Sequence, residues 1–132
     1  MENGLNLKIF TKSKKILDET VEAVFIPALT GEIGILPGHR PLLASLGIGI
    51  LRYLKDGKEY FLGVDEGIVE VLDNNITVLL DRIIEREKVR EEEELAKIAE
   101  AEESLKHLSG AEQEEAKKKI KRAETSLKLL KH

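Results

Sequence analysis

Cysteine and tryptophan are absent from this chain of 132 residues, and methionine occurs once. The lack of cysteine excludes a disulfide framework and a thiol nucleophile. The three histidines, His39, His107 and His132, lack the spacing of metal ligands, and the sequence contains no phosphate-binding loop or dinucleotide fingerprint. We therefore expect no catalytic residues, no metal site and no cofactor.

Long hydrophobic runs and basic aromatic patches are also missing. No segment approaches the length of a transmembrane span, and Met1 to Gly4 lack the features of a signal peptide. The net charge is −4, and the few aromatic residues do not alternate with basic ones. This composition does not indicate nucleic acid as a partner. We expect a soluble intracellular protein that does not insert into a membrane.

Residues 1–84 contain short apolar segments separated by turn residues. Leu5 to Ile9 alternate apolar and polar side chains, as a half-buried strand does. Asp56-Gly57 and Asp73-Asn74-Asn75 are turn signals between such segments. Further strands are expected at residues 21–28, 48–54, 59–64, 67–72 and 76–80. The pattern predicts an antiparallel β-sandwich or flattened barrel over residues 1–84.

Residues 85–132 have a different composition, with no proline, no aromatic residue and one glycine. This segment predicts an antiparallel two-helix hairpin broken at Ser109-Gly110. Two interpretations of the break remain open. Gly110 can end the first helix in a left-handed conformation, or Ser109 can cap the second helix in a capping box with Glu112.

The two predicted helices have apolar seams and opposite charge. Residues 85–103 carry a net charge of −5, and residues 111–131 carry +3. Antiparallel packing is expected to place Leu95 near Ala123. The second seam consists of Ala116, Ile120, Ala123, Leu127 and Leu130. A seam so rich in alanine buries little area, so we expect the hairpin to dock on the sandwich, on a partner, or alternately on both.

The most distinctive segment is Gly31 to Leu46, which begins Gly-Glu-Ile-Gly-Ile-Leu-Pro-Gly-His-Arg-Pro-Leu. Its glycines and prolines predict two short strands joined by a stiff corner that presents His39 and Arg40. This segment resembles the signature of the epsilon subunit of F-type ATP synthases, whose mitochondrial counterpart is called delta. The resemblance extends over essentially the whole chain.

The resemblance implies a non-catalytic rotor subunit of the bacterial type, on the central stalk. It implies packing against the gamma subunit, and contact with the rotor ring of membrane c subunits through Glu32 and His39. Without it, these two residues are an ordinary turn glutamate and surface histidine. Such a subunit helps to couple proton or sodium flow to ATP synthesis. It lies peripherally at the cytoplasmic face of the bacterial inner membrane.

The resemblance also implies that the hairpin can extend and inhibit ATP hydrolysis. Basic residues of its second helix would then meet an acidic segment of the catalytic beta subunits, although a solvated helix face is the simpler interpretation of these residues. The candidates are Lys117, Lys118, Lys121, Arg122 and Lys128. Some bacterial members bind ATP through Ile/Leu-Asp-x-x-Arg-Ala, where this chain has Val89 to Glu94, ending in four glutamates. We expect no tight ATP binding.

Two other functions are compatible with the residues alone. One is a free adaptor, with a ligand-binding sandwich and a hairpin that dimerises as a coiled coil. The other is a small enzyme of the sandwich class, against which the lack of a nucleophile–base pair counts. Asp65 and Glu66 are interpreted as ordinary loop charges or, less simply, as a partner contact.

Overall fold

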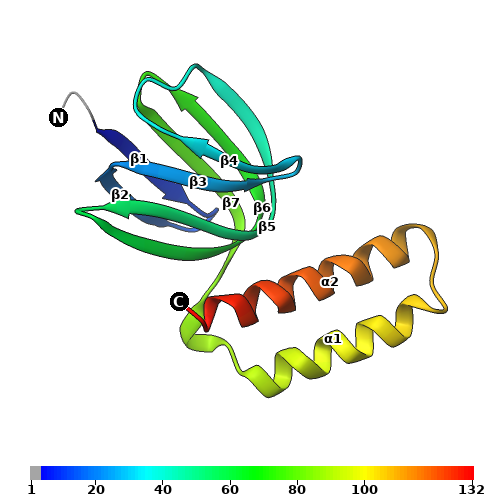
Figure 1. The fold of residues 1–132 in the computed structure, drawn as a ribbon. Helices are drawn as coiled ribbons and strands as arrows, with labels where there is room; N and C mark the ends of the chain where they lie inside the picture. Colours follow the sequence, from blue (N-terminus) through cyan, green and yellow to red (C-terminus); the bar gives the residue numbers. More distant parts are fainter. Residues whose placement is uncertain (1–3) are drawn as a thin grey trace.

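The computed structural model describes residues 4–132, in which seven strands precede two α-helices (Figure 1). Met1 to Asn3 lie outside the described residues, and so does the part of the signal-peptide expectation that rests on them. The strands are β1 (Leu5–Phe10), β2 (Lys15–Val21), β3 (Ala23–Ala28), β4 (Gly31–Ile35), β5 (Leu42–Lys55), β6 (Lys58–Leu72) and β7 (Asn75–Ile84). A short 3-10 helix (Arg86–Lys88) leads to α1 (Glu91–Leu105) and α2 (Gly110–Leu129).

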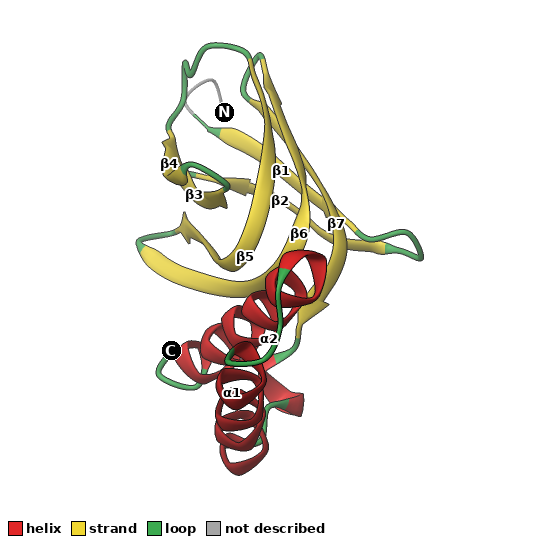
Figure 2. Cartoon of the chain, turned by 90° about the vertical axis from the view of Figure 1, so that its right-hand side faces the viewer, coloured by secondary structure: helices red, strands yellow, loops and turns green. Residues whose placement is uncertain are grey.

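The strands form one hydrogen-bonded sheet in the order β2-β1-β7-β6-β5-β3-β4. The long strands β5 and β6 bend, so that the sheet curls around its own apolar face (Figure 2). All neighbours are antiparallel except β1 and β7, which pair in parallel. The core is lined by aliphatic residues from both layers, including Leu7, Ile26, Leu51, Val69 and Val78. The predicted sandwich followed by two helices is confirmed.

Besides the parallel pairing of β1 with β7, two details of the sheet differ from the predicted antiparallel arrangement. Strand β2 was not predicted, because this edge strand is mostly polar and its only apolar residues are Ile16, Leu17 and Val21. The predicted strands at residues 59–64 and 67–72 are one strand, β6. Asp65 and Glu66 therefore lie within a strand and not in a loop.

The break in the hairpin combines parts of the two open interpretations. Gly110 has a positive φ of 61°, as a left-handed residue requires, but α1 ends earlier, at Leu105. Ser109 occupies the N-cap position of α2, and its side chain makes no capping hydrogen bond. Gly110 thus turns the chain into α2, and no capping box forms with Glu112.

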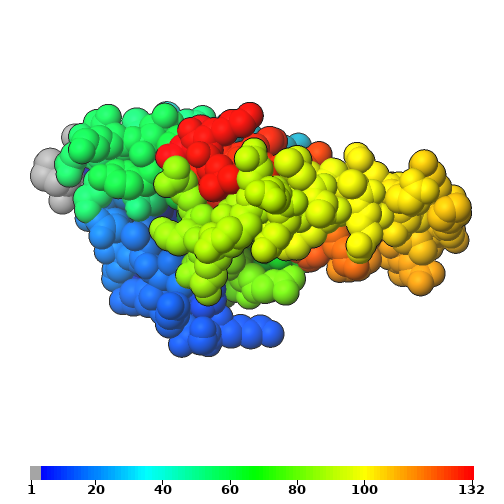
Figure 3. Space-filling model, turned by 90° about the horizontal axis from the view of Figure 1, so that it is seen from below, coloured from blue at the N-terminus to red at the C-terminus, as the bar shows by residue number. Residues whose placement is uncertain are grey.

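The hairpin lies against one end of the sandwich. Helix α2 contacts β5 and β6, and α1 packs mainly on α2 (Figure 1). Seen from below, the turn between the helices projects beyond the strands (Figure 3). Within residues 4–132, neither helix is long and apolar enough to cross a membrane. The hairpin is therefore docked on the sandwich, one of the arrangements expected from its narrow seam.

Candidate functional site

The docked face of α2 is formed by residues spaced four, three and four apart. Lys118, Arg122, Thr125 and Leu129 lie at this spacing, which places them on one side of a helix. Thr125 and Leu129 are each 2% exposed, so this face is covered by the sheet. The docked face thus has an apolar end at Leu129 and a charged end at Lys118 and Arg122.

Leu129 occupies a socket created by a glycine of β6. A Cβ atom added to Gly63 would lie 2.6 Å from Cδ1 of Leu129 and 2.7 Å from Cβ of Ile84. Real Cβ atoms do not approach other atoms so closely, so a larger residue at Gly63 would displace the helix or the neighbouring strand. The missing side chain at Gly63 is what allows α2 to approach the sheet.

The end of α2 is held by the segment that connects the sheet to α1. Nε of Arg86 donates to the carbonyl oxygen of Leu129 at 3.0 Å, and a terminal nitrogen of Arg86 donates to that of Leu130 at 3.4 Å. The last carbonyls of a helix lack partners within the helix, and a cation beside them is favourable. The rings of His132 and Phe61 stack with centroids 3.9 Å apart. Both ends of the hairpin segment therefore meet at the same place.

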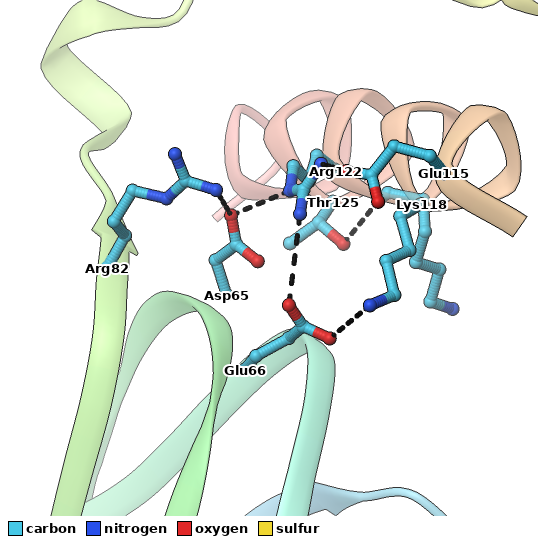
Figure 4. A network of polar contacts seen from close by, with 8 residues as sticks. Asp65, Glu66, Arg82, Glu115, Lys118, Arg122 and Thr125 are labelled. Carbon is cyan, nitrogen blue, oxygen red and sulfur yellow. Dashed lines mark hydrogen bonds and ion pairs between the residues drawn. The ribbon is translucent and has the colours of Figure 1, made fainter. Parts of the chain in front are cut away.

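The charged end of the interface centres on Asp65, which is 3% exposed (Figure 4). Nε of Arg122 donates to Oδ2 of Asp65 at 2.7 Å, and a terminal nitrogen of Arg82 lies 3.2 Å from the same oxygen. The other oxygen of Asp65 has no hydrogen-bond partner among the described residues. A buried carboxylate is costly unless it is paired, and here one arginine comes from the sheet and one from the hairpin.

Glu66 supplies a second carboxylate beside the first. Its backbone has a positive φ of 61°, which is uncommon for a residue with a side chain. Nζ of Lys118 lies 2.9 Å from Oε2 of Glu66, and Arg122 lies 3.8 Å from Oε1 (Figure 4). The hydrogen bond to Glu66 raises the pKa of Lys118 above its ordinary value. We call Asp65 and Glu66 together the carboxylate pair.

The five basic residues singled out from the sequence fall into two groups. Lys118 and Arg122 are half-buried and face the carboxylate pair. Lys117, Lys121 and Lys128 are exposed, and Lys117 has an ion-pair partner in Glu114 at 3.4 Å. The carboxylate pair was not predicted from the sequence as the partner of α2. Two adjacent carboxylates near the middle of a strand, together with a later helix of net positive charge, were the available signal.

The signature segment forms the stiff corner expected. Gly38 has a φ of 86°, and its backbone N–H donates to Oδ1 of Asn74 at 2.8 Å. The N–H of His39 donates to the carbonyl of Leu36 at 3.1 Å, and its Nδ1 donates to the carbonyl of Arg40 at 2.7 Å. The bond to Asn74 anchors the loop to the turn between β6 and β7, and the bond from Nδ1 orients the imidazole.

Glu32 and His39 are not adjacent in the structure. Glu32 is near the start of β4, and His39 follows the loop beyond its end. Arg52 lies 3.5 Å from the Glu32 carboxylate and 2.7 Å from that of Glu59, with its guanidinium over the Phe25 ring. A groove of about 510 Å³, lined by Glu32, Glu66, Lys117, Lys118 and Lys121 among others, separates the β3–β4 turn from α2. Glu32 and His39 thus lie at opposite ends of β4, Glu32 near its start and His39 after its end.

An apolar surface covers the outer face of β5, β6 and β7, and the sequence analysis did not predict it. Ile68 is opposite Ser45 on one side and Leu79 on the other, and Leu79 is opposite Phe10. A shallow groove of about 590 Å³ runs over these strands. The large exposed residues of this outer face and its rim are Leu29, Leu43, Ile68, Leu72 and Leu79. Contiguous exposed apolar side chains of this kind mark interaction surfaces.

The seam between the two helices contains small residues and one carboxylate. Ala101, Ala116 and Ala123 are buried, as is Glu94, which lies 3.3 Å from Nζ of Lys97. Leu95 is 53% exposed, so it does not fill the apolar seam as predicted. The helix is rotated so that Glu94 takes the inward position. Among residues 4–132, no group of three or more histidine, aspartate and glutamate side chains has a metal-binding arrangement.

Comparisons with known proteins agree with the fold. The beta-sandwich domain of the ATP synthase delta/epsilon chain matches residues 4–86. The ATP synthase epsilon chain of Desulfitobacterium hafniense strain Y51 is 37% identical over 127 residues, covering 96% of this chain and 91% of the relative. That of Lawsonia intracellularis is 43% identical over 81 residues, and the match spans 61% of each protein.

Solved structures share the whole fold at lower sequence identity. A chain of the Euglena gracilis mitochondrial ATP synthase, described as OSCP/F1/c-ring, has a TM-score of 0.86 at 22% identity, covering 98% of this chain and 82% of that one. A chain of the Tetrahymena thermophila ATP synthase central stalk and c-ring has a TM-score of 0.64 at 17% identity, covering 95% of each. By its sandwich match and its nearly full-length relative, the chain belongs to the family of ATP synthase epsilon chains.

Proposed function

We propose that this chain is a non-catalytic central-stalk subunit that helps to couple ion-driven rotation to ATP synthesis, and that its hairpin can extend to inhibit ATP hydrolysis. Family membership supports the first part, and the solved structures with the same fold come from assemblies described as containing F1, the c-ring or the central stalk. The observation that carries the proposal is a sandwich with an exposed apolar surface and an exposed corner loop. Its hairpin contacts the sandwich mainly through α2.

The outer apolar surface is the candidate contact for the gamma subunit. Leu29, Ile68 and Leu79 lie on it without cover, whereas α2 docks on another part of β5 and β6. Burial of apolar side chains is the main favourable term in stable association. A stalk subunit must remain attached while torque is applied, and this surface offers the largest set of exposed aliphatic side chains described above.

We expect Ile68→Asp to weaken binding to the gamma subunit by at least tenfold, or about 1.4 kcal/mol. The reason is that a charge would enter an apolar contact without a partner. Titration calorimetry with purified gamma subunit measures the effect. Lys128→Asp, on the exposed side of α2, is the control and is expected to bind as the unchanged chain does. Unchanged affinity of the Ile68 variant would exclude this surface.

The corner loop is the candidate contact for the rotor ring. Its backbone hydrogen bonds to Leu36 and Asn74 hold His39 in place, and Glu32 lies exposed at the other end of β4. A loop with few accessible conformations transmits force with little slippage. Polar side chains on such a loop suit the polar loops of membrane c subunits, which would place the chain peripherally at the cytoplasmic face of the membrane.

The hairpin is the candidate inhibitory element. Extension would separate α2 from the sheet and release Lys118 and Arg122, so that all five basic residues could meet an acidic segment of the catalytic beta subunits. Lys117, Lys121 and Lys128 are already exposed in the docked state, whereas Lys118 and Arg122 are half-buried and paired with the sheet. A few kcal/mol between docked and extended states is enough for partners to select one of them.

The test uses the catalytic head of the same source, stripped of this chain, and measures ATP hydrolysis. We expect a chain ending at Arg86, which keeps all seven strands, to bind but not to inhibit. The full chain is expected to bind and to slow hydrolysis. If both bind and neither slows hydrolysis, the inhibitory role is excluded and the coupling role remains. If neither binds, the stalk role itself is wrong.

The adaptor alternative requires a coiled-coil seam that is free to dimerise. In the structure, Ala116 and Ala123 of α2 line the space shared with Ala101 of α1, and Leu129 is buried against Gly63. Both sides of α2 that carry small or apolar residues are thus occupied within the chain. This arrangement favours the stalk subunit over the adaptor.

A further inference from the structure

The contacts that hold the hairpin are apolar at one end of α2 and charged at the other. At one end, Leu129 fills the socket at Gly63. At the other end, Arg122 and Lys118 meet the carboxylate pair. Glu66 lies beside Asp65 in β6, and its carboxylate contacts both Lys118 and Arg122.

Asp65 loses one of its two arginine contacts if the hairpin leaves. Its carboxylate is buried, and the bond from Nε of Arg122 is the shorter of its two arginine contacts, at 2.7 Å against 3.2 Å for Arg82. Arg82 belongs to β7 and remains beside Asp65 whatever the hairpin does. Undocking therefore removes one of two cations and does not leave the carboxylate unpaired, which keeps the undocked state accessible.

The backbone conformation of Glu66 directs its carboxylate toward α2. A non-glycine residue at φ 61° is strained, and the strain is tolerated here in a strand where glycine would relieve it. In this conformation the side chain of Glu66 reaches Lys118 at 2.9 Å and Arg122 at 3.8 Å. The strained position is thus the one that supplies the second anion to α2.

We propose that the carboxylate pair is an electrostatic latch that sets the docked fraction of the hairpin by binding Arg122 and Lys118. A consequence for inhibition follows, and it rests on the function proposed above. Arg122 and Lys118 are two of the five cations available for the inhibitory contact, so docking and inhibition compete for the same charges. A partner can use them only after the latch has released them, and strengthening the latch weakens inhibition.

The latch is tested on the isolated full-length chain by thiol protection. The chain has no cysteine, so a single introduced cysteine is its only thiol. Thr125→Cys places that thiol on the docked face, where the native side chain is 2% exposed, and it reacts with a soluble reagent only when α2 leaves the sheet. A separate Val69→Cys probe, in the sandwich core at 0% exposure, reports opening of the sandwich.

Arg122→Gln in the Thr125→Cys background is expected to raise the labelling rate by about tenfold or more, as the loss of a hydrogen bond to a buried charge implies. Lys118→Gln is expected to raise it by less than about fivefold, because its ion pair is more exposed. Lys128→Gln is the matched control, since Lys128 has no ion-pair partner in the described chain. In the Val69→Cys background, all three variants should label at the unchanged rate.

A double-variant cycle separates the latch from general damage to the helix. Combining Asp65→Asn with Arg122→Gln should raise labelling less than the product of the two single effects, because both remove the same contact. The proposal is overturned if the effects of Asp65→Asn and Arg122→Gln on the labelling rate simply multiply. It is also overturned if Arg122→Gln labels no faster than Lys128→Gln, or if labelling at Val69→Cys accelerates equally. None of these measurements involves ATP hydrolysis, so the latch can fail while the proposed inhibition stands, and the reverse.

Discussion

Leu129→Ala is expected to release the hairpin while the β-sandwich remains folded. The side chain of Leu129 is 2% exposed and fills the space above Gly63. Truncating a buried leucine to alanine costs about 2–5 kcal/mol, and here the loss falls on docking, because Leu129 lies outside the core of the sandwich. Small-angle X-ray scattering should show a larger radius of gyration, and trypsin should cleave more rapidly near Arg86, Lys88 and Arg90.

Leu95→Ala is the matched control on the other helix. Leu95 is 53% exposed, so its truncation should change neither the scattering profile nor the rate of cleavage. Circular dichroism of the Leu129 variant should retain the strand signal. If that variant stays as compact and as resistant as the unchanged chain, Leu129 is not the apolar anchor of the docked state.

Gly67→Ala is expected to lower the free energy of unfolding of the sandwich by about 3 kcal/mol or more. A Cβ atom at Gly67 would lie 2.2 Å from the carbonyl oxygen of Leu79 and 3.0 Å from Cα of Leu80, both in the backbone of β7. Backbone atoms cannot rotate away as a flexible side chain can, so β6 and β7 must separate. Urea denaturation followed by the emission of Tyr53 and Tyr60 measures the loss.

Gly57→Ala provides the comparison for this prediction. Gly57 lies in the β5–β6 turn with φ 77° and no atom within 4 Å of an added Cβ. Alanine there meets only backbone strain, which costs about 1–2 kcal/mol. The Gly67 variant should therefore be the less stable of the two. A smaller loss at Gly67 than at Gly57 would mean that β7 shifts without cost.

The fold could be predicted from the sequence to the extent that its signals are local. Asp56-Gly57 and Asp73-Asn74 marked turns that the structure contains, with positive φ at each of these residues. The edge strand β2 gave no such signal, because its polar residues alternate only weakly with apolar ones. The parallel pairing of β1 with β7 joins residues far apart in the chain, and nothing local encodes it.

The candidate site also has one part that local sequence signals predict and one part that they do not. His39 on a stiff corner follows from the prolines and glycines around it, and the structure confirms the turn. The partners of Arg122 and Lys118 depend on how α2 rests on β6, which no spacing within the helix reveals. The same holds for the hairpin seam, where the rotation of α1 places Glu94 inward and Leu95 outward. Contacts between elements, unlike those within one, require the packed structure.

The parallel pairing of the first and last strands has a consequence for folding during synthesis. Asn6 pairs with Asn75 and Phe10 with Leu79, so β1 has its second neighbour only after β7 has been made. At about 5–20 residues per second, the ribosome needs several seconds to make the intervening segment. The nascent chain therefore holds an open strand edge until the sheet is complete. The helices, which follow β7, emerge onto a sandwich that can already have closed.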